Sequence, residues 1–119
     1  MLKDNEEITI SGENLIDALS IIEFFLISFK NITRYYYDNV YPDIDRVGYE
    51  KEITRFIDNK HLIQELARLR AILSENFNDE LGIDDMDDIE RAMEKIKYWE
   101  NLEIKYLENG IVNIPYLGQ

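Results

Sequence analysis

The strongest periodic pattern in the chain covers residues 13–40. Hydrophobic residues recur there at spacings of three and four, which is the repeat of an α-helix. The members of this stripe are Leu15, Ala18, Leu19, Ile22, Phe25, Leu26, Phe29, Ile32, Tyr36 and Val40. Ile16, Phe24 and Ile27 lie off the stripe, and a helix that is apolar on several sides is usually central to its domain. We therefore expect this helix to be enclosed by others.

Three more helices are predicted, over residues 46–58, 60–78 and 85–108, with a short break at 58–60. Ser11 or Asn14 is expected to cap the first helix, and Asp84 or Asp85 the last. Pro42 ends the first helix because the residue before a proline disfavours the α conformation.

Short segments at the two ends, residues 6–10 and 111–116, are expected to be extended. The sequence thus predicts one all-α domain over residues 1–119, a bundle of four to five helices with short extended N- and C-terminal segments.

Composition narrows the class of partner. The chain has 25 acidic and 13 basic residues, a net charge of −12, which repels nucleic acid and anionic membranes and attracts basic protein surfaces. It has no cysteine, and its first residues lack the apolar stretch of a secretory signal. The longest apolar run, residues 21–29, is far shorter than the roughly 20 residues that span a bilayer. We expect a cytoplasmic protein.

The sequence NDELGIDDMDDIE, residues 78–90, contains the densest group of acidic residues. It holds seven carboxylates and no Lys or Arg. They are Asp79, Glu80, Asp84, Asp85, Asp87, Asp88 and Glu90. Helix capping accounts for two or three of them, since acids at a helix N-terminus interact favourably with its dipole. Two explanations remain for the others, a solvated turn and a patch that binds a partner.

The sequence YYYDNVYPDID, residues 35–45, concentrates tyrosines and aspartates. Successive helical residues point about 100° apart, so the three consecutive tyrosines cannot all face one core. Tyr36 falls in the apolar stripe, whereas Tyr35, Tyr37 and Tyr41 are candidates for contacting a partner, beside Asp43 and Asp45. The alternative is that a second helix covers Tyr35 and that Tyr41 packs in its own loop.

Metal and cofactor chemistry finds little support in the sequence, and no cofactor is expected. His61 is the single histidine, so a zinc site would lack a second imidazole. No calcium-binding loop has its required ligand spacing, and there is no glycine-rich phosphate loop. Glu100 and Glu103 have the spacing of magnesium-binding helical nucleotide hydrolases, but no matching acidic set is present on another helix.

One short motif resembles a catalytic one. RFIDNKH, from Arg55 to His61, resembles the R-x4-6-H signature of the HEPN ribonucleases, which are small helical domains. The resemblance implies an RNA-cleaving pair at a dimer interface. In this chain Phe56 replaces the small polar residue that usually follows the arginine in that family.

In overall character, the chain is similar to the immunity proteins of bacterial toxin systems. The segments NDELGIDDMDDIE and YYYDNVYPDID carry this resemblance. The resemblance implies a non-enzymatic inhibitor that binds a basic partner such as a toxin nuclease, with carboxylates at phosphate positions and tyrosines as anchors. Phage inhibitors of host defence share this profile. A third possibility is a homodimeric helical module that buries Ile16, Phe24 and Ile27 against a second copy.

Overall fold

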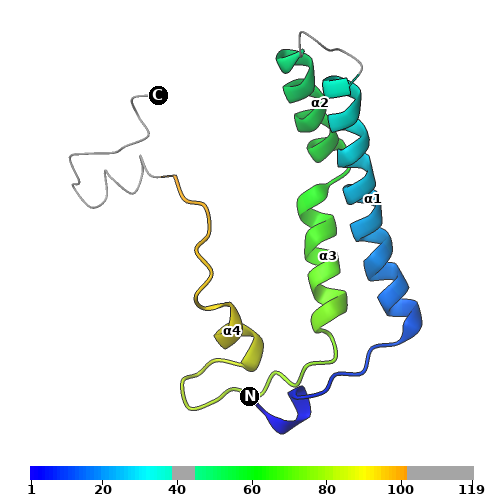
Figure 1. Ribbon diagram of the computed structural model, residues 1–119. Coiled ribbons are helices and arrows are strands. Elements are labelled where there is room, and N and C mark those ends of the chain that lie inside the picture. Colours follow the sequence, from blue (N-terminus) through cyan, green and yellow to red (C-terminus); the bar gives the residue numbers. More distant parts are fainter. Residues whose placement is uncertain (39–44, 102–119) are drawn as a thin grey trace, which may run out of the picture.

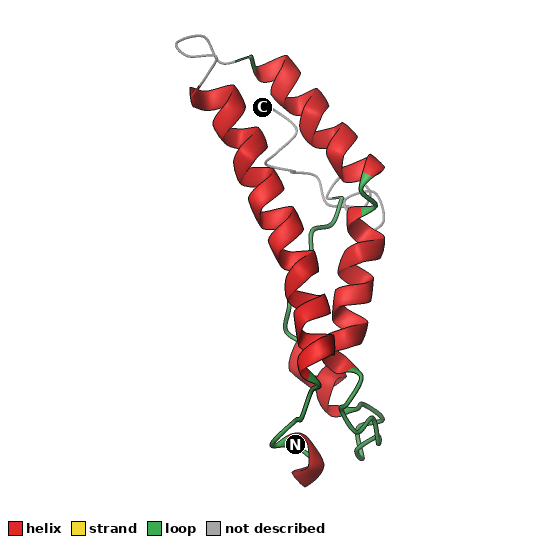
Figure 2. Cartoon of the chain, turned by 90° about the vertical axis from the view of Figure 1, so that its right-hand side faces the viewer, coloured by secondary structure: helices red, strands yellow, loops and turns green. Residues whose placement is uncertain are grey.

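The computed structural model describes residues 1–38 and 45–101. Its elements are the short 3₁₀ helix η1 (Lys3–Asn5) and the α-helices α1 (Gly12–Asp38), α2 (Arg46–Asn59), α3 (Leu62–Ser74) and α4 (Asp88–Met93). The long helix α1 runs antiparallel to α2 and α3, which follow one another along its side (Figures 1 and 2). No strand occurs in these two stretches, and the predicted all-α class is confirmed.

The start of α1 agrees with its sequence. The Ser11 hydroxyl oxygen accepts a hydrogen bond from the Asn14 backbone N–H at 3.1 Å, so Ser11, rather than Asn14, is the cap. The predicted end of the helix at Pro42 lies outside the described residues. None of the described helices is long and apolar enough to cross a bilayer.

An aromatic cluster joins α1 to α2. The ring of Phe56, on α2, lies 5.9 Å from that of Phe25 and 5.1 Å from that of Phe29, both in edge-to-face geometry. Ala18, Ile21 and Phe25 are the buried apolar side chains of the described residues. The inward face of α1 is therefore the line from Ala18 to Phe29. It coincides with the predicted stripe only in part, because Ile21 lies outside that stripe and the stripe members Leu19, Ile22 and Leu26 are 42–52% exposed.

The turn between α2 and α3 falls where the sequence predicted a break. The helix α2 ends at Asn59, and His61 adopts the left-handed conformation, with φ of 52°, before α3 begins at Leu62. At the other end of α2, the Asp45 carboxylate accepts a hydrogen bond from the Gly48 N–H at 2.8 Å. A Cβ at Gly48 would collide with that carboxylate, so a larger residue there would require the Asp45 side chain to rotate out of its capping position.

The predicted helix over residues 85–108 is wrong in the described residues, because α4 ends at Met93 and residues 96–101 have no regular structure. Short helices are marginal in water unless an apolar face packs against something. The side chains that continue this face are exposed, Ile96 at 47% and Trp99 at 87%. Residues 102–108 and the C-terminal extended segment 111–116 lie outside the described residues, while residues 6–10 are irregular.

The expectation that α1 is enclosed is also wrong within the described part of the chain. Only one side of this helix is buried against α2 and α3, and several large apolar side chains face outward. Ile16 is 66% exposed, Phe24 45% and Ile27 39%. The described residues form a helical hairpin with the N-terminal segment and α4 gathered at one end (Figure 1).

Candidate functional site

The N-terminal segment is held against the loop that follows α3. The Asn5 side-chain amide donates to the Asn78 carbonyl oxygen at 2.9 Å, and its oxygen accepts from the Asn78 N–H at 2.8 Å. Farther along, the Asn76 side-chain amide donates to the Thr9 carbonyl oxygen at 2.7 Å. Residues 4–9 therefore lie beside residues 76–80, although about seventy positions separate them in sequence.

Asp88, at the start of α4, is buried and ties the N-terminal segment to this helix. Its carboxylate accepts hydrogen bonds from the Leu2 N–H at 2.7 Å, from the Asn5 amide at 2.8 Å and from Arg91 at 2.9 Å. The Asn5 and Leu2 donors hold the pKa of Asp88 below its usual value, because they stabilise the ionised form. Asp88 is thus a structural residue of the fold.

Arg91 neutralises a second predicted site residue, Asp84. Two nitrogens of its guanidinium donate to the two Asp84 carboxylate oxygens, each at 2.8 Å, and one also donates to the Met86 carbonyl oxygen at 3.0 Å. This paired geometry is the strong form of an arginine–carboxylate contact. It holds the pKa of Asp84 well below its usual range and raises the pKa of Arg91.

Two further acids form a capping box. The Asp87 carboxylate accepts from the Glu90 N–H at 2.7 Å, and the Glu90 carboxylate accepts from the Asp87 N–H at 3.5 Å. Asp87 is therefore the cap of α4, and the prediction of Asp84 or Asp85 for that role is wrong. Together with Asp84 and Asp88, four of the seven acids make contacts within the chain. Asp79, Glu80 and Asp85 remain exposed.

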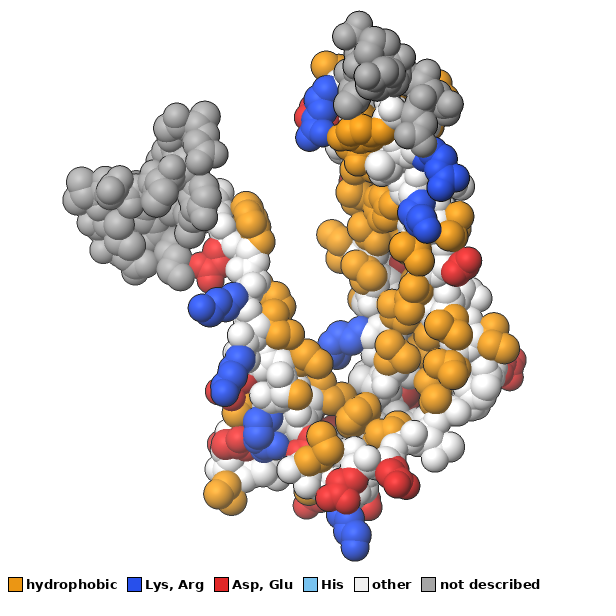
Figure 3. Space-filling model, viewed as in Figure 1, with side chains coloured by type: hydrophobic (Ala, Val, Ile, Leu, Met, Phe, Trp, Pro, Cys, Tyr) orange, Lys and Arg blue, Asp and Glu red, His pale blue; other side chains and the backbone are white. Residues whose placement is uncertain are grey.

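The structure adds acidic residues that sequence reasoning missed. Asp4, Glu6 and Glu7 are exposed and lie on the segment that runs beside Asp79 and Glu80. We call the set Asp4, Glu6, Glu7, Asp79 and Glu80 the acidic base. Figure 3 shows acidic side chains gathered at this end of the molecule. The signal in the sequence was the run KDNEE at residues 3–7, of which only Glu6 and Glu7 fall in the predicted extended segment 6–10.

The tyrosines lie at the other end of the hairpin. Tyr35 is 56% exposed, and its ring meets that of Tyr36 edge to face at 5.0 Å. Tyr37 packs on Tyr49 of α2 at 5.5 Å, and its hydroxyl oxygen accepts from Arg46 at 3.4 Å. Tyr37 thus joins α1 to α2, whereas Tyr35 presents most of its ring to solvent.

Asp45, Tyr41 and Asp43 are the other residues predicted for this end of the hairpin. Asp45 is exposed and caps α2, as described above. Tyr41 and Asp43 lie outside the described residues.

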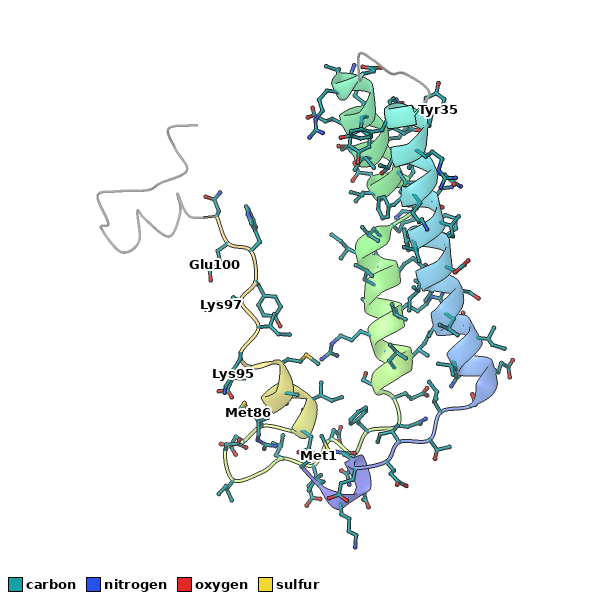
Figure 4. The ribbon with its side chains drawn as sticks, in the orientation of Figure 1. Met1, Tyr35, Met86, Lys95, Lys97 and Glu100 are labelled. Atoms are coloured by element: carbon teal, nitrogen blue, oxygen red, sulfur yellow. The ribbon has the colours of Figure 1, made fainter. Side chains whose placement is uncertain are left out.

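The two halves of the predicted site are far apart. The 27 residues of α1 span about 40 Å, with Tyr35 near one end and the acidic base at the other. Figure 4 shows Tyr35 at one tip of the hairpin and Met1 and Met86 at the opposite end. A small ligand cannot contact both halves, so only a large partner could use them together.

The R-x5-H motif is divided by the turn between α2 and α3. Arg55 contacts Glu52 at 3.5 Å, and Phe56 packs in the aromatic cluster. His61 is exposed, in the left-handed residue that separates the helices. The hollow beside the turn is lined instead by Lys60, Glu65 and Arg68, among others. Across residues 1–38 and 45–101, no three His, Cys, Asp or Glu side chains come together as metal ligands.

Comparison with known proteins assigns no family. No protein-family model matches the sequence, and no curated protein or solved structure matches it at a significant level.

The contact between Asp84 and Arg91 predicts that the stability of the fold depends on pH. Because the pKa of Asp84 is lower in the folded state than its usual 3.8, the unfolded chain binds more protons, and the contribution of Asp84 to stability is lost as pH falls below about 4. We expect the thermal unfolding midpoint to fall steeply between pH 5 and pH 2, and less steeply in Asp84→Asn. Asp58→Asn, at an exposed position on α2, should retain the wild-type slope. Equal slopes in all three proteins would contradict the role of Asp84.

Proposed function

We propose that this chain is a non-enzymatic inhibitor or immunity protein that binds a basic protein, such as a toxin nuclease, through the acidic base. The observation that carries the proposal is the joining of two acidic segments, residues 4–7 and 79–80, by the hydrogen bonds between Asn5 and Asn78. With a net charge of −12, the chain favours a partner that carries a basic surface.

Charge supplies the mechanism of recognition. A nuclease presents a basic cleft to the phosphates of its substrate, and an acidic surface would be steered toward that cleft at a high association rate. Carboxylates of the acidic base would occupy phosphate positions or pair with the lysines and arginines of the cleft. The substrate would then be excluded without any chemistry by the inhibitor.

The rigidity of the acidic base favours tight binding. Asn5 is 4% exposed and Asp88 7%, and both hold the N-terminal segment in place. A surface that is ordered before binding loses less conformational entropy when the complex forms. Tyr35 is a secondary contact that only a partner reaching about 40 Å along α1 would touch.

The proposal predicts an effect of charge removal that depends on position. In Asp79→Asn/Glu80→Gln, the association rate with a basic protein captured from the source cells should fall by about tenfold at low salt, since surface charges act mainly on the association rate. Surface plasmon resonance at two salt concentrations measures this rate directly.

Glu23→Gln/Asp58→Asn is the matched control. It makes the same change in net charge at exposed positions on α1 and α2. The control should lose less than half of its association rate. An equal loss in both variants would mean that total charge, and not the acidic base, directs binding; no loss in either would refute the proposal.

A further inference from the structure

An exposed apolar surface runs along the hairpin, beside the buried contact between its helices. Leu19, Ile22 and Leu26 each directly follow a buried residue of α1, and they are 52%, 42% and 51% exposed. Successive helical residues turn by about 100°, so these three side chains form one stripe beside the buried face. Their spacing of three and four is that of a surface which packs against another element.

The same surface continues onto α3. Leu66 and Leu73 also follow half-buried residues, and they are 49% and 45% exposed. The residue that follows a contact residue lies about 100° further around its helix axis. In two antiparallel helices, these following residues lie on the same side of the pair. Apolar side chains accordingly spread over α1 and α3 on one side of the hairpin (Figure 3). We call this set the hairpin face: Leu15, Leu19, Ile22, Leu26, Leu66 and Leu73.

The chain that follows α4 carries exposed apolar side chains of its own. Met93 is 43% exposed, Ile96 47% and Trp99 87%, at a spacing of three. The start of α4 already lies against the end of α3, where both line a hollow of about 230 Å³. After α4 the chain runs parallel to α1, from the end of the hairpin that holds Met1 toward the end that holds Tyr35 (Figures 1 and 4).

We propose that the segment after α4, residues 94–101, docks on the hairpin face and buries Trp99 there. Two apolar surfaces in one chain gain free energy by leaving water together. The six residues from Glu94 to Trp99 reach about 20 Å when extended, and the stripe from Leu15 to Leu26 is about 17 Å long. The extended segment is therefore long enough to cover the stripe.

Because the segment is attached to α4, its binding to the hairpin face is favoured over the binding of a second copy of the chain. A segment tethered at the edge of the face acts at an effective concentration in the millimolar range. A second copy must instead associate from dilute solution and bring together two chains that each carry a net charge of −12. This inference goes beyond the proposed function and does not depend on it, since the acidic base stays open when the hairpin face is covered.

Trp99 reports directly on the docking, because it is the single tryptophan of the chain. In the full-length protein, we expect blue-shifted emission and iodide quenching several-fold weaker than that of free tryptophan. Leu19→Lys/Ile22→Lys, which places charge in the hairpin face, should shift the emission to the red and restore quenching. Ile27→Lys, at a position about 140° around α1 from Ile22, should leave both unchanged.

A second set of variants keeps the test valid if lysine in the face unfolds the chain. The sequence has no cysteine, so Ile22→Cys and Ile27→Cys can each carry a single nitroxide label. The label at residue 22 should quench Trp99 emission strongly, and the label at residue 27 weakly. Wild-type emission like that of free tryptophan, or equal quenching by both labels, would overturn the proposal. So would a blue shift that appears only on concentration, together with a dimer mass in sedimentation, because the occupant would then be a second copy.

Discussion

Phe25→Ala is expected to lower the free energy of unfolding by about 3–4 kcal/mol, because the ring is buried and its removal leaves a cavity. The Phe25 ring meets those of Phe24, Phe29 and Phe56 at 5.1, 6.3 and 5.9 Å, and so links α1 to α2. A loss of this size is a large part of the total stability of a small domain. Urea unfolding followed by far-ultraviolet circular dichroism measures it.

Phe24→Ala is the matched control, one position along the same helix. Its ring stacks on Phe56 at 5.8 Å but is 45% exposed, so its truncation should cost roughly 1 kcal/mol. If the two variants lose equal stability, Phe25 is not the centre of the contact between the helices.

Asn5→Asp is expected to destabilise the chain by about 3 kcal/mol at neutral pH and to release the N-terminal segment from the acidic base. The substitution keeps the shape of the side chain but removes both amide donors, to the Asn78 carbonyl oxygen and to Asp88. It also places a second carboxylate where the Asn5 nitrogen lay, 2.8 Å from an oxygen of Asp88. Thermal unfolding and amide hydrogen exchange of residues 2–9 measure the two effects.

Asn31→Asp makes the same chemical change at an exposed position on α1. Its stability should stay within about 0.5 kcal/mol of wild type. Unaltered hydrogen exchange of residues 2–9 in Asn5→Asp would show that the buried amide does not hold this segment.

The sequence predicted correctly those features of the helices that depend on neighbouring residues. The spacing of apolar residues in α1, the Ser11 cap and the break between α2 and α3 all depend on residues within a few positions of each other. The extent of α4 depends on tertiary packing. The sequence continues a helical pattern past Met93, but the apolar side chains Ile96 and Trp99 there are 47% and 87% exposed, and the helix ends.

The candidate site could be predicted only in part, because long-range contacts decide which acids remain free. Arg91, which pairs with Asp84 and Asp88, lies one position beyond the acidic sequence 78–90. Asn5 brings residues 4–7 beside Asp79 and Glu80, and nothing in local spacing links segments so far apart.

Carboxylate labelling of the captured complex tests the central claim most directly. A carbodiimide together with an added primary amine converts accessible Asp and Glu side chains to amides, and mass spectrometry compares the labelling of each residue with and without the basic partner. The account predicts strong protection of Glu6, Glu7, Asp79 and Glu80, with Glu23 and Asp58 labelled as in the free chain. Protection of Glu23 and Asp58 with the acidic base still labelled would contradict it.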